Sequence, residues 1–219
     1  MKDPSRSQFA SKPPRLPSQF RPRKQPVQGR SRATVEAVLA ATLQVLRKHG
    51  AAALTTTRVA EVAGVSVGSL YQYFPNKRAL VAALKLQYFE RITGRTLAAI
   101  HAARGLPLAA AVAHIVGELL AAKRDNRVMS LALNASLAEL GGRAWVRQGG
   151  AVLSDPLVEL LRDADVARPE VAARIVVTSI EGVIAAALES DPHALDDPGL
   201  GDELVTLACA YLERRRRAC

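Results

Sequence analysis

The segment from Leu54 to Leu80 constrains the fold of this chain more than any other stretch of the sequence. Two short helical stretches lie on either side of Gly64, and a further helix begins just after Pro75. A glycine permits a tight turn between two helices, and helices usually end at or before the residue that precedes a proline. The spacing therefore predicts a compact helix-turn-helix unit that runs into a longer helix. Ser66 and Asn76 are expected to cap its later helices, and its small core is expected to contain Val59, Ala60, Leu70 and Phe74.

Apolar residues recur at helical spacing through most of the remaining sequence, with no strand alternation and no internal repeat. Hydrophobic residues make up 49% of the 219 residues but aromatic residues only 4%, so the core must be built from Ala, Leu and Val. This mixture favours helices over sheets. We predict an all-α chain of about nine helices, near residues 34–49, 55–63, 66–73, 77–101, 107–123, 126–140, 143–162, 169–189 and 201–217.

Positive charge is concentrated at the two ends of the chain, whose formal net charge is +10. Residues 1–32 hold nine Lys and Arg against a single Asp, and residues 214–217 are four consecutive Arg, so the body between them is slightly acidic. Such a balance favours an anionic partner. The alternative is that the basic ends are merely solvated.

The sequence offers no sign of secretion or of a membrane span. The N-terminus lacks an apolar signal core, and His114 and Glu118 interrupt the longest apolar run, residues 106–122. The two cysteines, Cys209 and Cys219, form neither a disulfide framework nor a metal-ligand spacing. We therefore expect a soluble cytoplasmic protein with no membrane partner.

The second short helix of the helix-turn-helix unit has the residue types that a DNA-reading helix needs. Ser66, Gly68 and Ser69 are small, so the backbone at its start can approach base edges in the major groove. Val67 lies among them and can contact a thymine methyl group. Groups that can bind phosphates lie on the flanks at Thr56, Thr57, Tyr71, Tyr73 and Lys77. The alternative is an ordinary helical hairpin with core tyrosines.

The string TTTRVAEVAGVSVGSLYQYFPNKRAL resembles the DNA-binding segment of TetR-type (TetR/AcrR) transcriptional regulators. It shares the Ala-Gly-Val-Ser turn, the Leu-Tyr pair, the aromatic-Phe pair and the Asn-Lys pair that opens the next helix. With the flanking helices, the resemblance covers about residues 30–91. It departs from the family at Val67, where a longer or polar residue is common. Hydrogen-bonded base reading is therefore expected at Thr57, Gln72 or Tyr73.

The resemblance implies three regions and a set of DNA contacts. The regions are a disordered basic tail at 1–28, a DNA-binding domain at 29–91 with its motif at about 55–74, and a helical effector-binding and dimerisation domain at 92–219. The DNA-contacting positions that it implies are Thr56, Thr57, Ser66, Val67, Gly68, Ser69, Tyr71, Tyr73 and Lys77. We add Arg32, which lies just before the first helix, and Gln72.

The family plan also implies an effector pocket among the middle helices and a homodimer interface on the last two long helices. The pocket candidates are Tyr88, His101, His114, Asn134 and Trp145. The interface candidates are Ile180, Ile184, Leu188, Leu204, Ala208 and Tyr211. The alternative is that these apolar stripes belong to the intramolecular core.

Together these features predict a sequence-specific repressor that releases operator DNA when a small molecule binds its C-terminal domain. As the resemblance implies, it would be associated with the nucleoid when bound to DNA. The alternatives are a transcriptional activator, or non-specific binding of nucleic acid or an acidic surface through the basic ends. The sequence lacks GxxxxGK[ST], GxSxG and HExxH motifs, and its four His residues are scattered. We therefore expect no enzyme, no metal and no cofactor.

Overall fold

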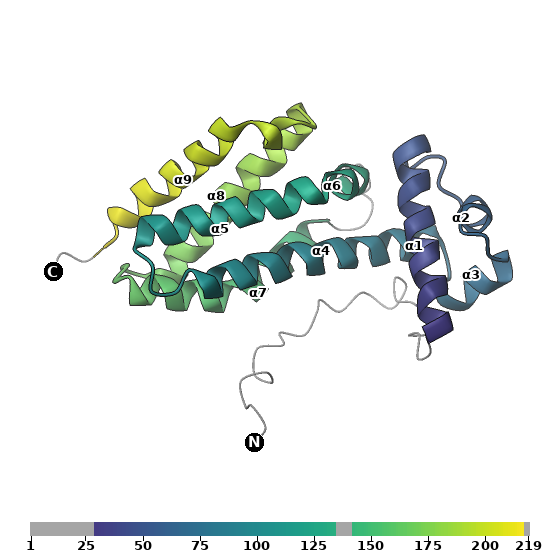
Figure 1. Cartoon of the computed structure of the whole chain (residues 1–219), viewed down its shortest axis with the longest axis horizontal. Helices are drawn as coiled ribbons and strands as arrows, with labels where there is room; N and C mark the ends of the chain where they lie inside the picture. Colours follow the sequence, from purple (N-terminus) through teal and green to yellow (C-terminus); the bar gives the residue numbers. More distant parts are fainter. Residues whose placement is uncertain (1–28, 135–141, 217–219) are drawn as a thin grey trace, which may run out of the picture.

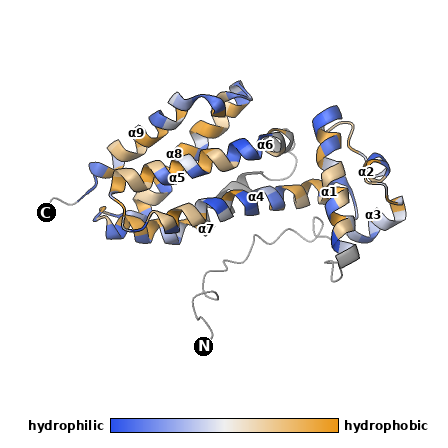
Figure 2. Cartoon of the chain, in the orientation of Figure 1, coloured by the Kyte–Doolittle hydropathy of each residue, from blue (hydrophilic) through white to orange (hydrophobic). Residues whose placement is uncertain are grey.

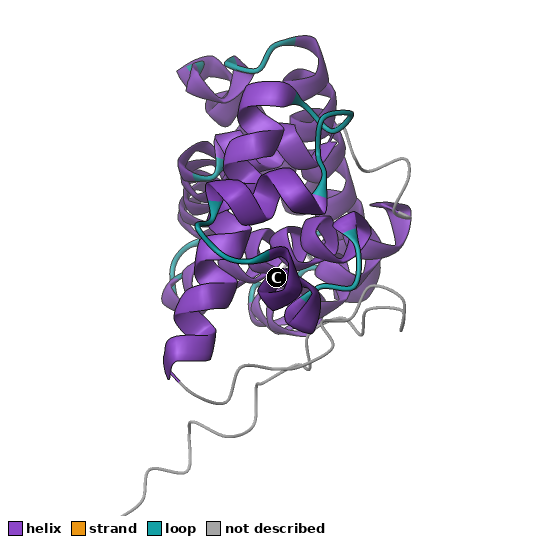
Figure 3. Cartoon of the chain, turned by 90° about the vertical axis from the view of Figure 1, so that its right-hand side faces the viewer, coloured by secondary structure: helices purple, strands orange, loops and turns teal. Residues whose placement is uncertain are grey.

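The computed structural model describes residues 29–134 and 142–216. Within these residues the chain forms helices joined by short turns, and no strand is present (Figures 1 and 3). A single isolated bridge joins Val166 to Arg216. The predicted all-α fold is thus confirmed for the described part of the chain. The predicted basic tail at 1–28 lies outside the described residues.

Three of the first four helices begin at side-chain N-caps. Their bounds are α1 (Gly29–His49), α2 (Thr56–Val62), α3 (Val67–Tyr73) and α4 (Lys77–Ala102). The side chains of Thr55, Ser66 and Asn76 accept hydrogen bonds from backbone N–H groups three residues on, at the starts of α2, α3 and α4. An N-cap satisfies a backbone donor that the first helical turn leaves without a partner. The caps predicted at Ser66 and Asn76 are confirmed.

Gly64 makes the turn between α2 and α3. Its φ is +66°, in the left-handed region that residues with a side chain rarely adopt. The Val65 N–H donates to the Ala60 carbonyl at 3.0 Å and closes the turn. The glycine in the predicted motif is therefore required by the backbone conformation.

The remaining helices form the C-terminal bundle. Their bounds are α5 (Leu108–Asp125), α6 (Arg127–Asn134), α7 (Gly142–Asp163), α8 (Pro169–Ser190), the short 3₁₀ helix η4 (Ala194–Asp196) and α9 (Pro198–Glu213). The last helix begins three residues before the predicted start. The Asp197 side chain caps it by accepting from the Gly199 N–H, and Pro198 suits the first turn.

Two clusters of buried side chains are joined through α4. The N-terminal cluster lies between α1, α2, α3 and the first half of α4, with Leu70 and Phe74 among its largest members. The C-terminal cluster combines the second half of α4 with α5, α7, α8 and α9. Tyr88 packs against both clusters. Helix α4 therefore runs from the N-terminal helices into the bundle as one continuous element (Figure 1).

The residues predicted for the dimer interface are mostly part of the core of this chain. Ile180, Ile184, Leu188, Leu204 and Ala208 are all buried, and Tyr211 is half-buried. These five side chains face the neighbouring helices of the same chain, and the interface on the last two long helices stays a prediction. Instead, α8 exposes Ile175 and Val183, and α9 exposes Leu207.

Helix α8 has apolar residues on more than one face. Figure 2 shows α8 and α9 as mainly hydrophobic between hydrophilic ends. Among the described helices, α8 alone is long and apolar enough to cross a membrane, which is weak evidence for a single helix. Arg174 and Glu181 interrupt the apolar sequence of this helix. Only 28% of the apolar segment is buried, so much of α8 is free to contact another surface.

Candidate functional site

The packing of α2 against α3 sets the position of the predicted DNA-contacting side chains. Val59, Ala60, Leu70 and Phe74 are buried between these helices and α1 and α4, as the sequence predicted. Ala60 is a small residue at the crossing, so the two short helices approach closely. The opposite faces of α2 and α3 are thereby directed away from the core.

A hydrogen bond joins the exposed sides of α2 and α3. The Thr56 Oγ1 atom and the Tyr71 hydroxyl lie 3.1 Å apart, although the residues are 15 positions apart in the sequence. Thr56 is half-buried, whereas Tyr71 is 40% exposed. Two of the predicted phosphate-binding hydroxyls therefore meet at one point, where both can contact the same stretch of DNA backbone.

The start of α3 is small and open. The Ser66 and Ser69 hydroxyl oxygens lie 2.8 Å apart, and Val67 is 37% exposed. A Cβ atom added at Gly68 would meet only the Ser66 Oγ, at an ordinary 3.8 Å. Nothing among the described residues therefore requires glycine at this position. Its effect is to leave space for a molecule that approaches from outside.

The other predicted contact residues differ in how accessible they are. Arg32, Thr57, Gln72 and Lys77 are exposed. Tyr73 is half-buried and packs against the N-terminal core. Because part of its ring packs against the core, Tyr73 is a weaker candidate for base reading than the exposed Gln72.

Arg58 adds a cation that the sequence interpretation did not single out. It is exposed on α2, one residue after Thr57, and its Nη1 donates to the Ala53 carbonyl at 3.2 Å. This bond holds the guanidinium beside the start of α2. No motif position marks Arg58, so only the fold identifies it as a neighbour of the phosphate-binding hydroxyls.

A cavity of about 60 Å³ lies in the C-terminal core between α4, α5, α7, α8 and α9. Thirteen of its fifteen lining residues are aliphatic, and the other two are Thr96 and Glu181. No aromatic side chain is among its described lining residues. A concave, mostly apolar space with a few polar groups is the usual form of a small-molecule site.

The predicted pocket residues lie elsewhere wherever their side chains are described. His101 and His114 are exposed, and Tyr88 donates from its hydroxyl to the Ser130 Oγ at 3.2 Å. His101 follows the cavity-lining Ile100 by one residue, which turns it about 100° around α4. His114 lies two residues after Val112 and faces away for the same reason. The side chains of Asn134 and Trp145 lie outside the described part.

An ion pair with low exposure adjoins the cavity. Lys123 on α5 donates from Nζ to the Glu181 Oε2 on α8 at 2.8 Å, and the two side chains are 10% and 33% exposed. Burial by itself would lower the pKa of Lys123, but attraction to Glu181 and the hydrogen bond outweigh it and raise that pKa. Lys123 is therefore charged at neutral pH and neutralises the carboxylate on the cavity wall.

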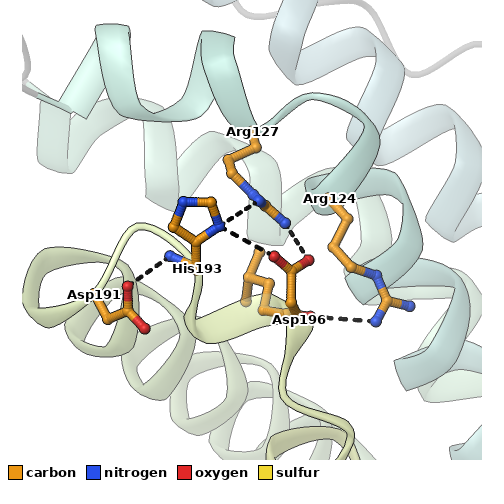
Figure 4. A network of polar contacts seen from close by, with 6 residues as sticks. Arg124, Arg127, Asp191, His193 and Asp196 are labelled. Carbon is orange, nitrogen blue, oxygen red and sulfur yellow. Dashed lines mark hydrogen bonds and ion pairs between the residues drawn. The ribbon is translucent and has the colours of Figure 1, made fainter.

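A polar network ties α6 to the connection between α8 and α9 (Figure 4). Arg127 pairs with Asp196, and its Nη1 lies 3.0 Å from the His193 Nδ1. Hydrogen bonds from Arg127 and His193 lower the pKa of Asp196. Arg124 donates to the Leu195 carbonyl at 3.2 Å. Because α6 also packs against α1 and α4, the network connects the α8–α9 turn with the N-terminal helices.

Two family profiles match separate parts of the chain. Residues 38–84 match the family described as bacterial regulatory proteins, tetR family. Residues 107–212 match the tetracyclin repressor-like C-terminal domain. Together the matched segments cover more than half of the chain. The first contains most of the N-terminal core cluster and the second most of the C-terminal one.

The chain is also similar to named repressors. The HTH-type transcriptional repressor KstR of Mycolicibacterium smegmatis (strain ATCC 700084 / mc(2)155) is 31% identical over 130 residues, which are 58% of this chain and 63% of that protein. KstR of Rhodococcus jostii (strain RHA1) is 45% identical over 58 residues, which are 26% of this chain and 27% of that protein. The matches thus span less than two thirds of the length of either repressor.

A solved structure shares the fold over most of the chain. The TetR-family transcriptional regulator from Streptomyces coelicolor superposes with a TM-score of 0.56 and 27% sequence identity. The match covers 83% of this chain and 99% of that one.

Proposed function

The chain belongs to the TetR family of bacterial regulatory proteins, and from this premise we propose that it is a sequence-specific DNA-binding repressor that responds to a small molecule. The observation that carries the proposal is the open start of α3, where small residues surround the exposed Val67. Such a surface allows a short helix to enter the major groove. Similarity to KstR repressors supports repression as the mode of control.

In this proposal the contacts divide into two kinds. Thr56, Thr57, Tyr71 and Lys77 bind phosphates and position the protein, whereas Val67 and its neighbours at the start of α3 read base edges. Arg58 joins the first group because it lies exposed beside Thr57. Phosphate contacts contribute affinity for any sequence, so discrimination depends on α3.

Two copies of the chain are needed to read two half-sites, and we place their contact on α8 and α9. The exposed Ile175, Val183 and Leu207 form an apolar face, and small residues at Ser179 and Gly182 on α8 allow another helix to approach closely. A homodimer through this face buries apolar surface that the single chain leaves in water. It also presents the two α3 helices to successive grooves.

Helix α4 provides the route from effector to DNA. Its second half lines the cavity through Thr96 and Ile100, and its first turn at Lys77 follows directly after α3. A ligand that widens the cavity tilts α4 and moves the two α3 helices away from the spacing of the grooves. By linkage, operator DNA then weakens ligand binding to the same degree.

The decisive experiment is a salt titration of DNA binding by the purified full chain. One duplex comes from DNA that flanks its own gene, and the other is a shuffled duplex of the same composition. We expect a saturable complex on the native duplex near physiological salt, with an even number of chains per site. Equal affinity for both duplexes, lost together as salt rises, would contradict sequence-specific binding to this duplex.

Removal of residues 1–28 tests the alternative of binding through the basic tail. We expect the truncated chain to keep its preference for the native duplex and to show a shallower dependence on salt. Each phosphate contact that is lost changes the slope of log affinity against log salt by about 0.9. Loss of nearly all affinity for both duplexes would favour non-specific binding by the tail instead.

A further inference from the structure

The cavity in the C-terminal core has an unusually uniform wall. Apart from Thr96 and Glu181, its lining consists of Leu, Ile and Val side chains from five helices. Its volume of about 60 Å³ gives room for roughly four to six water molecules, each about the size of one methylene group. A wall of this kind favours aliphatic or alicyclic carbon, because its described residues offer no ring for stacking and no cation.

Both polar lining residues can accept a hydrogen bond from a ligand, but only Glu181 carries a negative charge. The Thr96 hydroxyl donates to the Ile92 carbonyl at 2.9 Å, so its proton is already used within α4. The Glu181 Oε2 accepts from Lys123, and the other carboxylate oxygen has no partner among the described residues. The described lining therefore offers hydrogen-bond acceptors but no spare donor.

The Lys123–Glu181 pair determines which head groups the cavity tolerates. A carboxylate ligand would meet the Glu181 carboxylate, while the Lys123 charge that could balance it is already paired. An amine would compete with Lys123 for Glu181 and leave a lysine that is only 10% exposed without its partner. Removing one partner of a buried ion pair is strongly unfavourable. A neutral group that donates one hydrogen bond leaves the pair intact.

We propose that the effector of this chain is a neutral aliphatic or alicyclic molecule whose hydroxyl group donates a hydrogen bond to Glu181. The inference rests on the proposed regulatory function and adds the chemical class of the effector to it. The alkyl part fills the space between α4, α5, α7 and α8. In the conformation described, that space takes a chain of about six carbons, and a bulkier ligand must push α4 outward.

The first test compares four probes of nearly equal size by isothermal titration calorimetry with the full chain at pH 7.5. The probes are 1-hexanol, its isomer methyl pentyl ether, which accepts but cannot donate, hexylamine and hexanoate. We expect 1-hexanol to bind about tenfold or more tightly than each of the others, as a hydrogen bond to a charged acceptor requires. Equal binding of alcohol and ether, or no binding of the alcohol, overturns the proposal.

The second test reverses the preference by breaking the ion pair from either side. In Glu181→Gln the freed Lys123 should make hexanoate the tightest ligand, and in Lys123→Met the freed Glu181 should favour hexylamine. Because Glu181 is one-third exposed, Lys123→Met is the variant more certain to fold. An unchanged order of probes in the folded variants contradicts a role for the pair.

Two controls locate the binding site. Glu189→Gln removes an exposed carboxylate two turns further along α8 and should leave the order of probes unchanged. Val177→Phe fills the cavity from a half-buried position and should abolish binding of all four probes. Full 1-hexanol binding by a folded Val177→Phe variant places the ligand elsewhere and overturns the proposal.

Fluorescence anisotropy of the native duplex separates this inference from the proposed function. If 1-hexanol binds with the expected dependence on Glu181 but the duplex stays bound, the ligand class holds and ligand-driven release fails. If the duplex is bound specifically but the probes show no preference for the alcohol, the DNA-binding function holds and the inference fails.

Discussion

At the scale of single residues, the buried ammonium of Lys85 opposes folding. This side chain is only 5% exposed, and its Nζ has no hydrogen-bond partner among the described residues. Burial lowers the pKa of Lys85 from 10.5 to about 8. A charge that loses its hydration without gaining a partner destabilises the folded state. The residue stands on α4, which connects the two cores.

Replacing Lys85 by Met should raise the free energy of unfolding at pH 7 by about 1–3 kcal/mol. The Lys85 pKa is higher in the unfolded chain than in the folded chain, so the burial of its charge lowers the free energy of unfolding by the full amount below pH 8. It diminishes as the pH rises from about 8 toward 10.5. Urea unfolding at fixed protein concentration should therefore show that the difference in free energy of unfolding between the variant and the original chain becomes smaller above pH 8. The exposed Lys77→Met serves as control, and a similar gain there would refute this account.

The DNA-facing residues should separate into two classes of effect. Tyr71→Phe removes the hydroxyl beside Thr56 and should weaken binding to native and shuffled duplexes alike, by about fivefold. Val67→Ala should reduce the preference for the native duplex and leave binding to the shuffled one nearly unchanged. Anisotropy titrations of both variants on both duplexes measure this. Equal losses on both duplexes for Val67→Ala would show that Val67 does not read bases.

At the scale of elements, short helices depend on their ends. Helices α2 and α3 each have seven residues, too few for stable isolated helices. They persist because Thr55 and Ser66 cap them, Gly64 sets the angle between them, and their inner faces are buried. These features are local in sequence, which is why the motif could be predicted with its caps. The longer α4 gains additional stability from its contacts with both cores.

Gly64→Ala should lower the free energy of unfolding by about 1–2 kcal/mol and weaken DNA binding. The cost comes from the backbone alone, because a Cβ at this position would meet nothing within 4 Å. Gly94→Ala in the middle of α4 is the matched control: it has equally open space and ordinary helical geometry. It should stabilise the chain by about 0.5–1 kcal/mol. Chemical unfolding that finds the same sign for both variants would contradict this assignment.

At the scale of the whole molecule, two properties depend on how the helices pack. One is the apolar face that α8 and α9 leave exposed, and the other is the cavity beneath it. The inner and outer faces of α8 are both apolar, so its hydrophobic pattern alone does not show which face turns inward. One face of α8 packs against α7, and the face that carries Val183 remains exposed and can contact a partner.

The double substitution Val183→Glu with Leu207→Glu should convert a homodimer to monomers without unfolding the chain. Both side chains are already exposed in the single chain, at 40% and 49%, so the substitutions should destabilise the interface and not the fold of the chain. Sedimentation velocity measures the mass, and circular dichroism measures the helix content. Val62→Glu makes the same kind of change at an exposed valine on α2 and should leave the mass unchanged. A double variant that keeps the mass of two chains would place the interface elsewhere.

The sequence by itself determined the features that depend on neighbours within a turn or two of helix. These are the helices, the caps at Ser66 and Asn76, the glycine turn, and the small residues that begin α3. Their physics is local, because caps and turns involve residues two to five positions apart. The small, open start of α3 could therefore be predicted from the sequence, whereas the partial burial of Tyr73 against the core could not.

Only the tertiary structure decided which faces of the helices meet. The 3.6-residue period shows that a helix has an apolar face but does not identify the face that packs against it. Thus Ile180 and Leu204 proved to be core, His101 and His114 turned away from the cavity, and Lys123 found Glu181 across 58 positions of sequence. The effector site depends on such long-range pairs, because five helices must come together before their side chains enclose a space.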